Sequence, residues 1–194
     1  MRTRALVLAV AALVAVIGIV LLTGNSSDSG DDTAATDPAA ERAYADAPAP
    51  LRALYADRNQ LLGGGADAFE RRVDELRGYP IVVNKWASWC GPCRAEFPVF
   101  QKAAIQEARR IAFLGVDSTD NEDDAREFLG EFPLTYPSYK DPDLKVAGVF
   151  NGVGAFPTTA FYDRRGKVAY VHQGPYDSVE ELLSDVRRYT GSGA

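Results

Sequence analysis

The chain has 194 residues and a formal net charge of −6. This acidic balance argues against a protein that binds nucleic acid through a broadly basic surface. Its two cysteines are too few for a small secreted domain held together by several disulfides.

The first 22 residues predict a membrane anchor. Arg2 and Arg4 lie in a short basic leader, and an apolar run extends from Ala5 to Leu22. A helix of this length spans about 27 Å, close to the thickness of a bilayer core. The run ends in a poor cleavage site, so an uncleaved single-pass anchor is favoured over a cleaved signal peptide or a buried helix. The basic leader predicts a protein of the cell membrane whose remaining residues lie outside the cytoplasm. If the N-terminal segment is cleaved, the protein is secreted.

Residues 23–50 predict a flexible acidic tether. The segment is rich in Ala, Asp, Ser, Gly and Pro and has no large aliphatic side chain. It therefore buries too little apolar surface to offset the entropy of ordering. Residues 51–194 remain, and they suffice for one domain with a single core.

This domain begins with two predicted helices. Leucines at helical spacing predict the first over Leu51–Leu62, ending at three glycines, and an amphipathic pattern predicts the second over Asp67–Arg77. Tyr79–Ala87 then predicts a strand. Cys93–Arg110 predicts the longest helix, which Pro98 is expected to kink.

The second half alternates strands and helices. Ile111–Asp117 is almost continuously apolar, which is typical of a parallel strand covered on both faces. Thr119 and Glu122 have the spacing of a capping box for a helix that runs through Phe132. A short strand over Tyr136–Lys140 and a helical turn over Pro142–Phe150 are expected next.

The C-terminal part predicts a hairpin and a last helix. Thr158–Asp163 and Val168–Gly174 flank a four-residue turn, as in a β-hairpin. Ser178 and Glu181 cap a helix over Val179–Tyr189. The order of these elements predicts an α/β fold, a mixed sheet with helices on both faces.

Both cysteines lie in the stretch NKWASWCGPC, residues 84–93. A structural bridge between Cys90 and Cys93 closes so short a loop that it removes little entropy from the unfolded chain. A structural zinc site needs four ligands, and the chain offers one cysteine pair and a single histidine, His172, far away. The sequence therefore predicts neither a metal site nor a cofactor.

A redox pair has a physical basis at this position. Cys93 lies in the first turn of a predicted helix, where free N–H groups and the helix dipole favour a thiolate. They lower the pKa of the leading Cys90 thiol and make it the nucleophile. Gly91 permits a close approach of the chain, and Pro92 occupies a position where helices tolerate proline. Cys90 would form a mixed disulfide that Cys93 resolves.

The stretch WASWCGPC resembles the active site of the thioredoxin superfamily. Residues 67–189 are similar to its membrane-anchored extracytoplasmic branch, the TlpA-like thiol–disulfide oxidoreductases that include cytochrome c maturation proteins, and GAFPTTAFYD supports the likeness. The resemblance implies a thioredoxin-like fold with a mixed central sheet flanked by helices. It also implies that Pro157 is a cis-proline facing the disulfide, that the Phe156 backbone binds a thiol partner, and that Glu96 is the acidic residue of the active-site helix.

Several residues near the motif have alternative interpretations. Glu96 either takes part in proton transfer near Cys93 or is only a carboxylate favoured by the helix dipole. Trp86 is expected beneath the disulfide, and Trp89 on the exposed rim with Gly91, Pro92 and Phe156 as the substrate-binding surface. His172 is interpreted as a surface residue at a strand end.

Two positions depart from cytoplasmic thioredoxin. Asn84 replaces a buried aspartate that assists proton transfer, which leaves Glu96 or water for that role. Lys85 occupies the place of a core aromatic residue, and a lysine inside a strand needs a carboxylate partner or a route to solvent.

The sequence thus predicts an extracytoplasmic thiol–disulfide oxidoreductase. The Gly-Pro dipeptide between the cysteines is that of thioredoxin, a reductant with a potential of about −270 mV. The predicted task is to reduce disulfides in secreted or membrane-associated proteins, apocytochrome c by family analogy, as a monomer recharged by a membrane electron donor. The alternatives are an oxidase that forms disulfides in secreted proteins and a non-enzymatic Cu(I) delivery protein.

Overall fold

The computed structural model describes residues 38–191. The predicted anchor at residues 1–22 and most of the predicted tether lie outside this range. Within it, no helix is both long enough and apolar enough to cross a bilayer.

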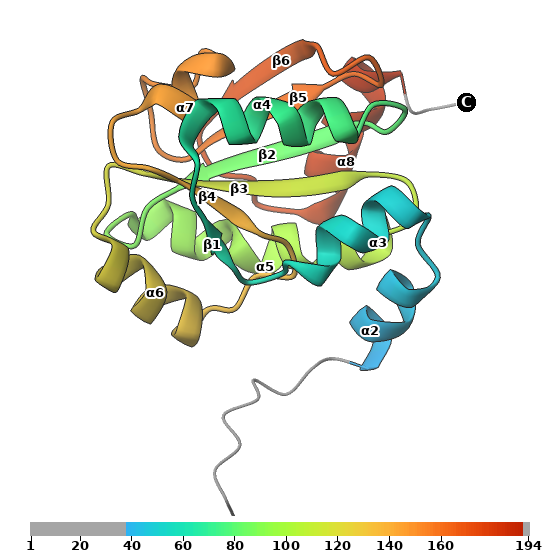
Figure 1. Cartoon of the computed structure of the whole chain (residues 1–194), viewed down its shortest axis with the longest axis horizontal. Coiled ribbons are helices and arrows are strands. Elements are labelled where there is room, and N and C mark those ends of the chain that lie inside the picture. The colour runs from blue at the N-terminus through green and yellow to red at the C-terminus, as the bar shows by residue number, and fades with distance from the viewer. Residues whose placement is uncertain (1–37, 192–194) are drawn as a thin grey trace, which may run out of the picture. The chain divides into compact units, whose positions relative to one another are not determined.

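A six-stranded mixed sheet forms the centre of the fold (Figure 1). Its order is β1-β4-β3-β2-β5-β6; the first four strands in this order run parallel, and β2–β5 and β5–β6 are antiparallel. The strands are β1 (Leu61–Leu62), β2 (Ile81–Trp86), β3 (Ala112–Ser118), β4 (Ser138–Asp141), β5 (Thr158–Tyr162) and β6 (Val168–Gln173). The mixed sheet and the terminal hairpin predicted from the sequence are confirmed.

Helices cover both faces of this sheet (Figure 1). On one face α4 contacts α7 and β4, and on the other α5 contacts α8. The helices are α2 (Pro38–Ala45), α3 (Ala49–Ala56), α4 (Gly65–Glu75), α5 (Gly91–Gln106), α6 (Glu122–Glu131), α7 (Lys145–Val149) and α8 (Val179–Thr190). Strands β2, β3 and β5 are buried along their whole length, as expected for strands covered on both sides.

The predicted helix over Leu51–Leu62 is wrong at its C-terminal end. Helix α3 stops at Ala56, Asn59 adopts a positive φ of 59°, and the two leucines form β1. The leucines pair in parallel with Ser138 and Tyr139 of β4. Because a two-residue strand shows no periodicity of its own, the leucine spacing extended the helix too far.

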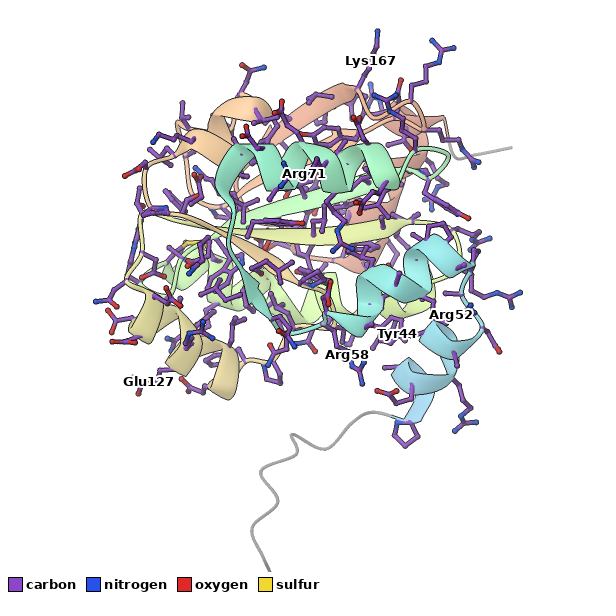
Figure 2. The ribbon with its side chains drawn as sticks, in the orientation of Figure 1. Tyr44, Arg52, Arg58, Arg71, Glu127 and Lys167 are labelled. Carbon is purple, nitrogen blue, oxygen red and sulfur yellow. A yellow bond between two sulfur atoms is a disulfide. The ribbon has the colours of Figure 1, made fainter. Side chains whose placement is uncertain are left out.

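The folded part begins earlier than Leu51. Pro38–Ala45, part of the predicted tether, forms helix α2. Its Tyr44 (labelled in Figure 2) stacks on the ring of Tyr55 of α3, with centroids 4.5 Å apart. Ala47, between the two helices, is also buried. One aromatic ring and small side chains suffice to dock the helix, and composition averaged over the segment concealed them.

The two predicted helix caps have different outcomes. The side chain of Ser178 accepts a hydrogen bond from the Glu181 amide at 3.1 Å, as predicted. Helix α6, however, is capped by Asn121, which accepts from the Asp123 amide at 2.8 Å. Thr119 adopts a positive φ of 53° and does not cap this helix.

Candidate active site

The two cysteines form a disulfide at the start of α5. Cys90 is the N-cap residue, and its Sγ accepts a hydrogen bond from the Cys93 amide at 3.2 Å. The Cα atoms lie 5.3 Å apart, with Pro92 in the first helical turn. Cys90 is 3% exposed and Cys93 is fully buried. Cys90 is thus the more exposed of the two, although it presents only a small part of its surface.

The loop before Cys90 is held by the segment that follows β3. Asp120 accepts two hydrogen bonds from Ser88, from its amide at 2.5 Å and its hydroxyl at 2.9 Å. Trp89 donates through Nε1 to the Thr119 carbonyl at 3.2 Å. These contacts fix the loop that presents Cys90. Sequence reasoning missed Asp120 because it lies about 30 residues further along the chain, with no motif to mark it.

An aromatic surface lies next to the disulfide. Trp89 is 60% exposed, and its ring packs against Phe156 with centroids 4.9 Å apart. The Phe156–Pro157 peptide bond is cis, as the resemblance implied. A Cβ added to Gly91 would meet no atom within 4 Å. The chain's own packing thus leaves the surface over Gly91 open.

Glu96 is buried one turn after Cys93 on α5. Its carboxylate accepts from Asn84 Nδ2 at 2.6 Å and from the Tyr176 amide at 3.1 Å. Burial raises the pKa of Glu96 to about 8, and the two hydrogen bonds partly oppose the shift. A carboxyl group with this pKa is suited to exchange protons near neutral pH.

Tyr176 is a second residue that the sequence did not reveal. Besides binding Glu96 through its backbone, it donates its hydroxyl to Asp185 of α8 at 2.7 Å. His172 of β6 packs against the Tyr176 ring with centroids 4.4 Å apart. His172 is partly exposed there, one residue before the end of β6.

Lys85 is fully buried in the central strand β2. Its ammonium donates to the Gly152 carbonyl at 2.6 Å and lies 3.8 Å from the centre of the Phe156 ring. Burial lowers the pKa of Lys85 to about 8, against the opposing effect of the Asp141 carboxylate. The lysine therefore binds a backbone carbonyl and an aromatic face, instead of the carboxylate contact or solvent route expected from the sequence.

Trp86 belongs to the core beneath α5 and α6. Its ring lies 5.5 Å from each of Phe97 and Phe128, and its Nε1 donates to Ser138 Oγ at 3.1 Å. Over residues 38–191 no group of three or more His, Cys, Asp or Glu side chains is placed to hold a metal ion.

A helix that starts at a cysteine pair, a cis-proline nearby and a mixed central sheet together define a thioredoxin-like protein. The chain belongs to the AhpC/TSA family, whose model matches residues 61–171.

Its relatives are thiol–disulfide proteins by name. The thiol-disulfide oxidoreductase ResA of Oceanobacillus iheyensis is 30% identical over 118 residues, which cover 59% of this chain and 61% of that protein. The thiol:disulfide interchange protein DsbE of Xylella fastidiosa is 35% identical over 129 residues, 61% of this chain and 64% of that protein. The match thus spans less than two thirds of each of these relatives.

A solved structure gives the same likeness in three dimensions. The structure of MTB DsbF in mixed oxidized and reduced forms has a TM-score of 0.53 and 34% sequence identity, and the match covers 61% of this chain and 84% of that one. The predicted superfamily is therefore confirmed.

Proposed function

We propose that this chain is a thiol–disulfide oxidoreductase that reduces disulfides of proteins outside the cytoplasm. The observation that carries the proposal is the Cys90–Cys93 disulfide at the N-terminus of α5, with the Glu96 carboxyl buried one turn further along the helix. The names of the ResA and DsbE relatives support this activity.

The reduced pair transfers two electrons in two exchanges. The Cys90 thiolate attacks one sulfur of the substrate disulfide, which forms a mixed disulfide and releases the first substrate thiolate. The Cys93 thiolate then attacks Cys90 Sγ, which releases the second substrate thiolate and closes the Cys90–Cys93 disulfide. The substrate gains two electrons and two protons, and the cysteine pair is oxidised.

Cys90 is the attacking residue because it lies at the helix N-terminus and is the more exposed of the two. The positive end of the helix dipole stabilises its thiolate. Burial disfavours a thiolate at Cys93, so this thiol needs a base at the resolving step. Glu96 is the residue proposed to accept that proton.

The substrate is proposed to dock on the surface around the disulfide, formed by Trp89, Gly91, Pro92 and Phe156. Trp89 supplies an exposed ring, and Gly91 leaves space for a close approach. Exposed aromatic side chains beside such space are typical of protein-binding surfaces. Pro157, which follows Phe156, completes the loop that faces the partner.

The cellular setting follows from the sequence. An uncleaved anchor at residues 1–22 would hold a monomeric domain at the outer side of the membrane, next to a membrane electron donor that re-reduces the pair. Apocytochrome c is the proposed substrate, in line with the family resemblance. Tethering raises the effective concentration of such partners.

Two measurements test the proposal. Redox titration of the protein is expected to give a potential near that of thioredoxin, about −270 mV. A Cys93→Ala variant is expected to accumulate mixed disulfides with extracytoplasmic proteins, and Cys90→Ala is the matched control that traps none. A potential near −120 mV would instead assign a disulfide-forming oxidase. Tight Cu(I) binding without disulfide exchange would assign metal delivery.

A further inference from the structure

A cavity of about 510 Å³ opens beside the active-site loop, at the carboxyl ends of the parallel strands β3 and β4. Ligands of open α/β sheets commonly bind at this edge. The cavity is adjacent to the loop that carries Cys90. Asp120 lines the cavity and also accepts two hydrogen bonds from Ser88 of that loop. A protein that reacts with Cys90 would therefore lie over this cavity.

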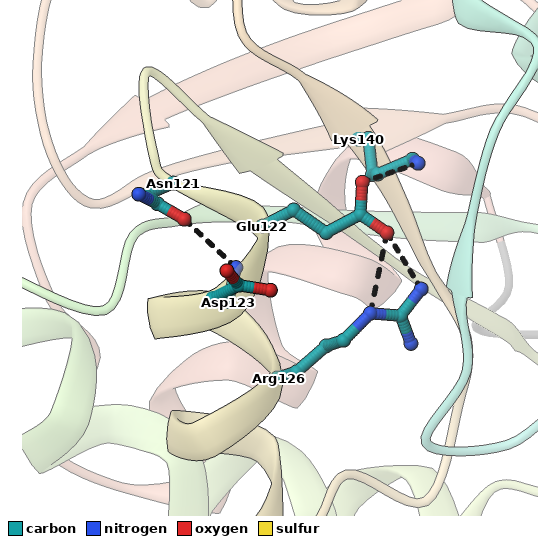
Figure 3. Close-up of polar contacts among 5 residues, drawn as sticks. All are labelled: Asn121, Glu122, Asp123, Arg126 and Lys140. Atoms are coloured by element: carbon teal, nitrogen blue, oxygen red, sulfur yellow. Dashed lines mark hydrogen bonds and ion pairs between the residues drawn. The ribbon is translucent and has the colours of Figure 1, made fainter.

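The lining is strongly acidic. Five carboxylates face two lysines; the carboxylates are those of Asp117, Asp120, Glu122, Asp141 and Asp143. Each lysine already has an acidic partner: Lys140 binds Glu122 at 2.8 Å (Figure 3), and Lys145 binds Asp143 at 3.4 Å. Asp141 accepts hydrogen bonds from Ser118 and from two amides of α7.

Three carboxylates, those of Asp117, Asp120 and Asp141, have no ion-pair partner among the described residues, and Asp141 is already held by three neutral donors. Asp120 accepts hydrogen bonds from the neutral donors Ser88 and Asn121. Asp117 is 4% exposed, and its Oδ1 has no hydrogen-bond partner within residues 38–191. Burial of a carboxylate without a compensating charge is costly. This buried, unpartnered atom in the wall of a cavity points to a ligand that supplies a positive charge.

The pKa of Asp117 agrees with this reading. It is raised to about 8, first by burial and then by Asp120, through its charge and a hydrogen bond, and by Asp141. A bound cation would take the place of the proton that these carboxylates otherwise hold. The carboxylates do not converge as a metal site requires, so a larger cation that carries its own donors fits better.

We propose that this cavity receives an arginine or lysine side chain of the protein whose cysteine reacts with Cys90, and so selects partners with a basic residue near the reactive cysteine. The inference rests on the proposed oxidoreductase function and adds a preference among its substrates. Asp117 and Asp120 are the residues that bind the cation. The protein is expected to prefer substrates by the positive charge near their reactive cysteine, whatever the rest of the substrate sequence.

Peptides with one cysteine, activated as a mixed disulfide with thionitrobenzoate, test this proposal. Arginine is placed in turn at each of the four positions on either side of the cysteine, and citrulline, its neutral isostere, replaces it in a paired series. The reduced full-length chain is mixed with each peptide in a stopped-flow instrument, and release of thionitrobenzoate gives the rate constant. At the positions that reach the cavity, arginine is expected to react about tenfold faster than citrulline, since charge-assisted hydrogen bonds are the stronger ones.

Variants connect this preference to the cavity. Asp117→Asn and Asp120→Asn are each expected to bring the arginine-to-citrulline ratio close to one. Glu127→Gln, on the outer surface of α6 and not part of the cavity, is the control that keeps the ratio (Figure 2).

Equal rates for arginine and citrulline at every position in the unmodified chain would overturn the inference and leave the oxidoreductase proposal intact. So would a ratio that persists in both aspartate variants. Failure of the chain to reduce any peptide would overturn the proposed function, and this inference with it.

Discussion

Asn84 donates a 2.6 Å hydrogen bond from its side chain to the Glu96 carboxylate, inside the core between β2 and α5. The second polar atom of the Asn84 side chain, Oδ1, is buried and has no hydrogen-bond partner in the described part of the chain. The amide of an asparagine has no acidic proton to give, but Asn84 holds and stabilises the carboxylate of Glu96. In the proposed mechanism, this pair takes the acid–base role that the buried aspartate has in cytoplasmic thioredoxin.

Glu96→Gln is expected to slow resolution of the mixed disulfide by about 10²-fold, the lower range for loss of a general base. The amide keeps the size of the side chain, so the fold and the first attack by Cys90 are expected to persist. Stopped-flow reduction of a model disulfide, with mass spectrometry to follow the mixed disulfide, measures both steps. Unchanged resolution would assign Glu96 a structural role only.

Asn84→Leu is expected to shift the pH dependence of resolution to higher pH. The hydrogen bond from Asn84 favours the ionised carboxylate, so its loss raises the pKa of Glu96 above about 8. The measurement is the resolution rate between pH 6 and pH 10. The double variant with Glu96→Gln is the control, because without a carboxyl group the Asn84 substitution has nothing to shift. An identical shift in both backgrounds would contradict the pairing.

Lys85→Met is expected to loosen the segment from Gly152 to Phe156. The substitution removes the hydrogen bond to the Gly152 carbonyl and the charge over the Phe156 ring, while it keeps the length of the side chain. Leaving a buried carbonyl without a donor costs about 1 to 3 kcal/mol, and relief from burying the ammonium offsets part of it. Hydrogen exchange of this segment is expected to accelerate. Lys102→Met, on the exposed face of α5, is the matched control, and equal protection in both variants would refute the anchoring role.

Sequence-based prediction succeeded for the part of the site that lies within one short motif. The segment from Asn84 to Cys93 runs from strand β2 through a short loop into helix α5, so local rules placed both cysteines at the start of the helix. The family resemblance pointed to Glu96. Contacts between distant segments could not be predicted in this way. Asp120 reaches Ser88, and the Tyr176 amide reaches Glu96 across 80 residues of sequence, through backbone placement that no side-chain pattern encodes.

The fold shows the same division. The buried strands were visible because each is an apolar run of sufficient length, as in Ala112–Ser118. Strand β1 was missed because a strand of two residues shows no periodicity of its own. The partner of Lys85 was also beyond prediction, since a carbonyl from the 151–157 segment is an acceptor that any residue type provides.

The stability of the fold is expected to fall as pH rises, and Glu96 is expected to account for part of the fall. Its ordinary pKa is 4.5 in the unfolded chain and about 8 in the folded one. The folded state therefore holds a proton that the unfolded state has released, so the stabilisation is complete below pH 4.5 and is lost as pH rises through 8. The slope contributed by one such group is about 1.4 kcal/mol per pH unit between these values.

Denaturant unfolding at a series of pH values, compared between the unmodified chain and Glu96→Gln, isolates this group from Asp117 and Lys85, which also titrate near pH 8. The difference in unfolding free energy between the two proteins is expected to change across this window. A difference that stays constant from pH 4.5 to pH 8 would mean that Glu96 is ionised throughout and does not hold the proton in the folded protein.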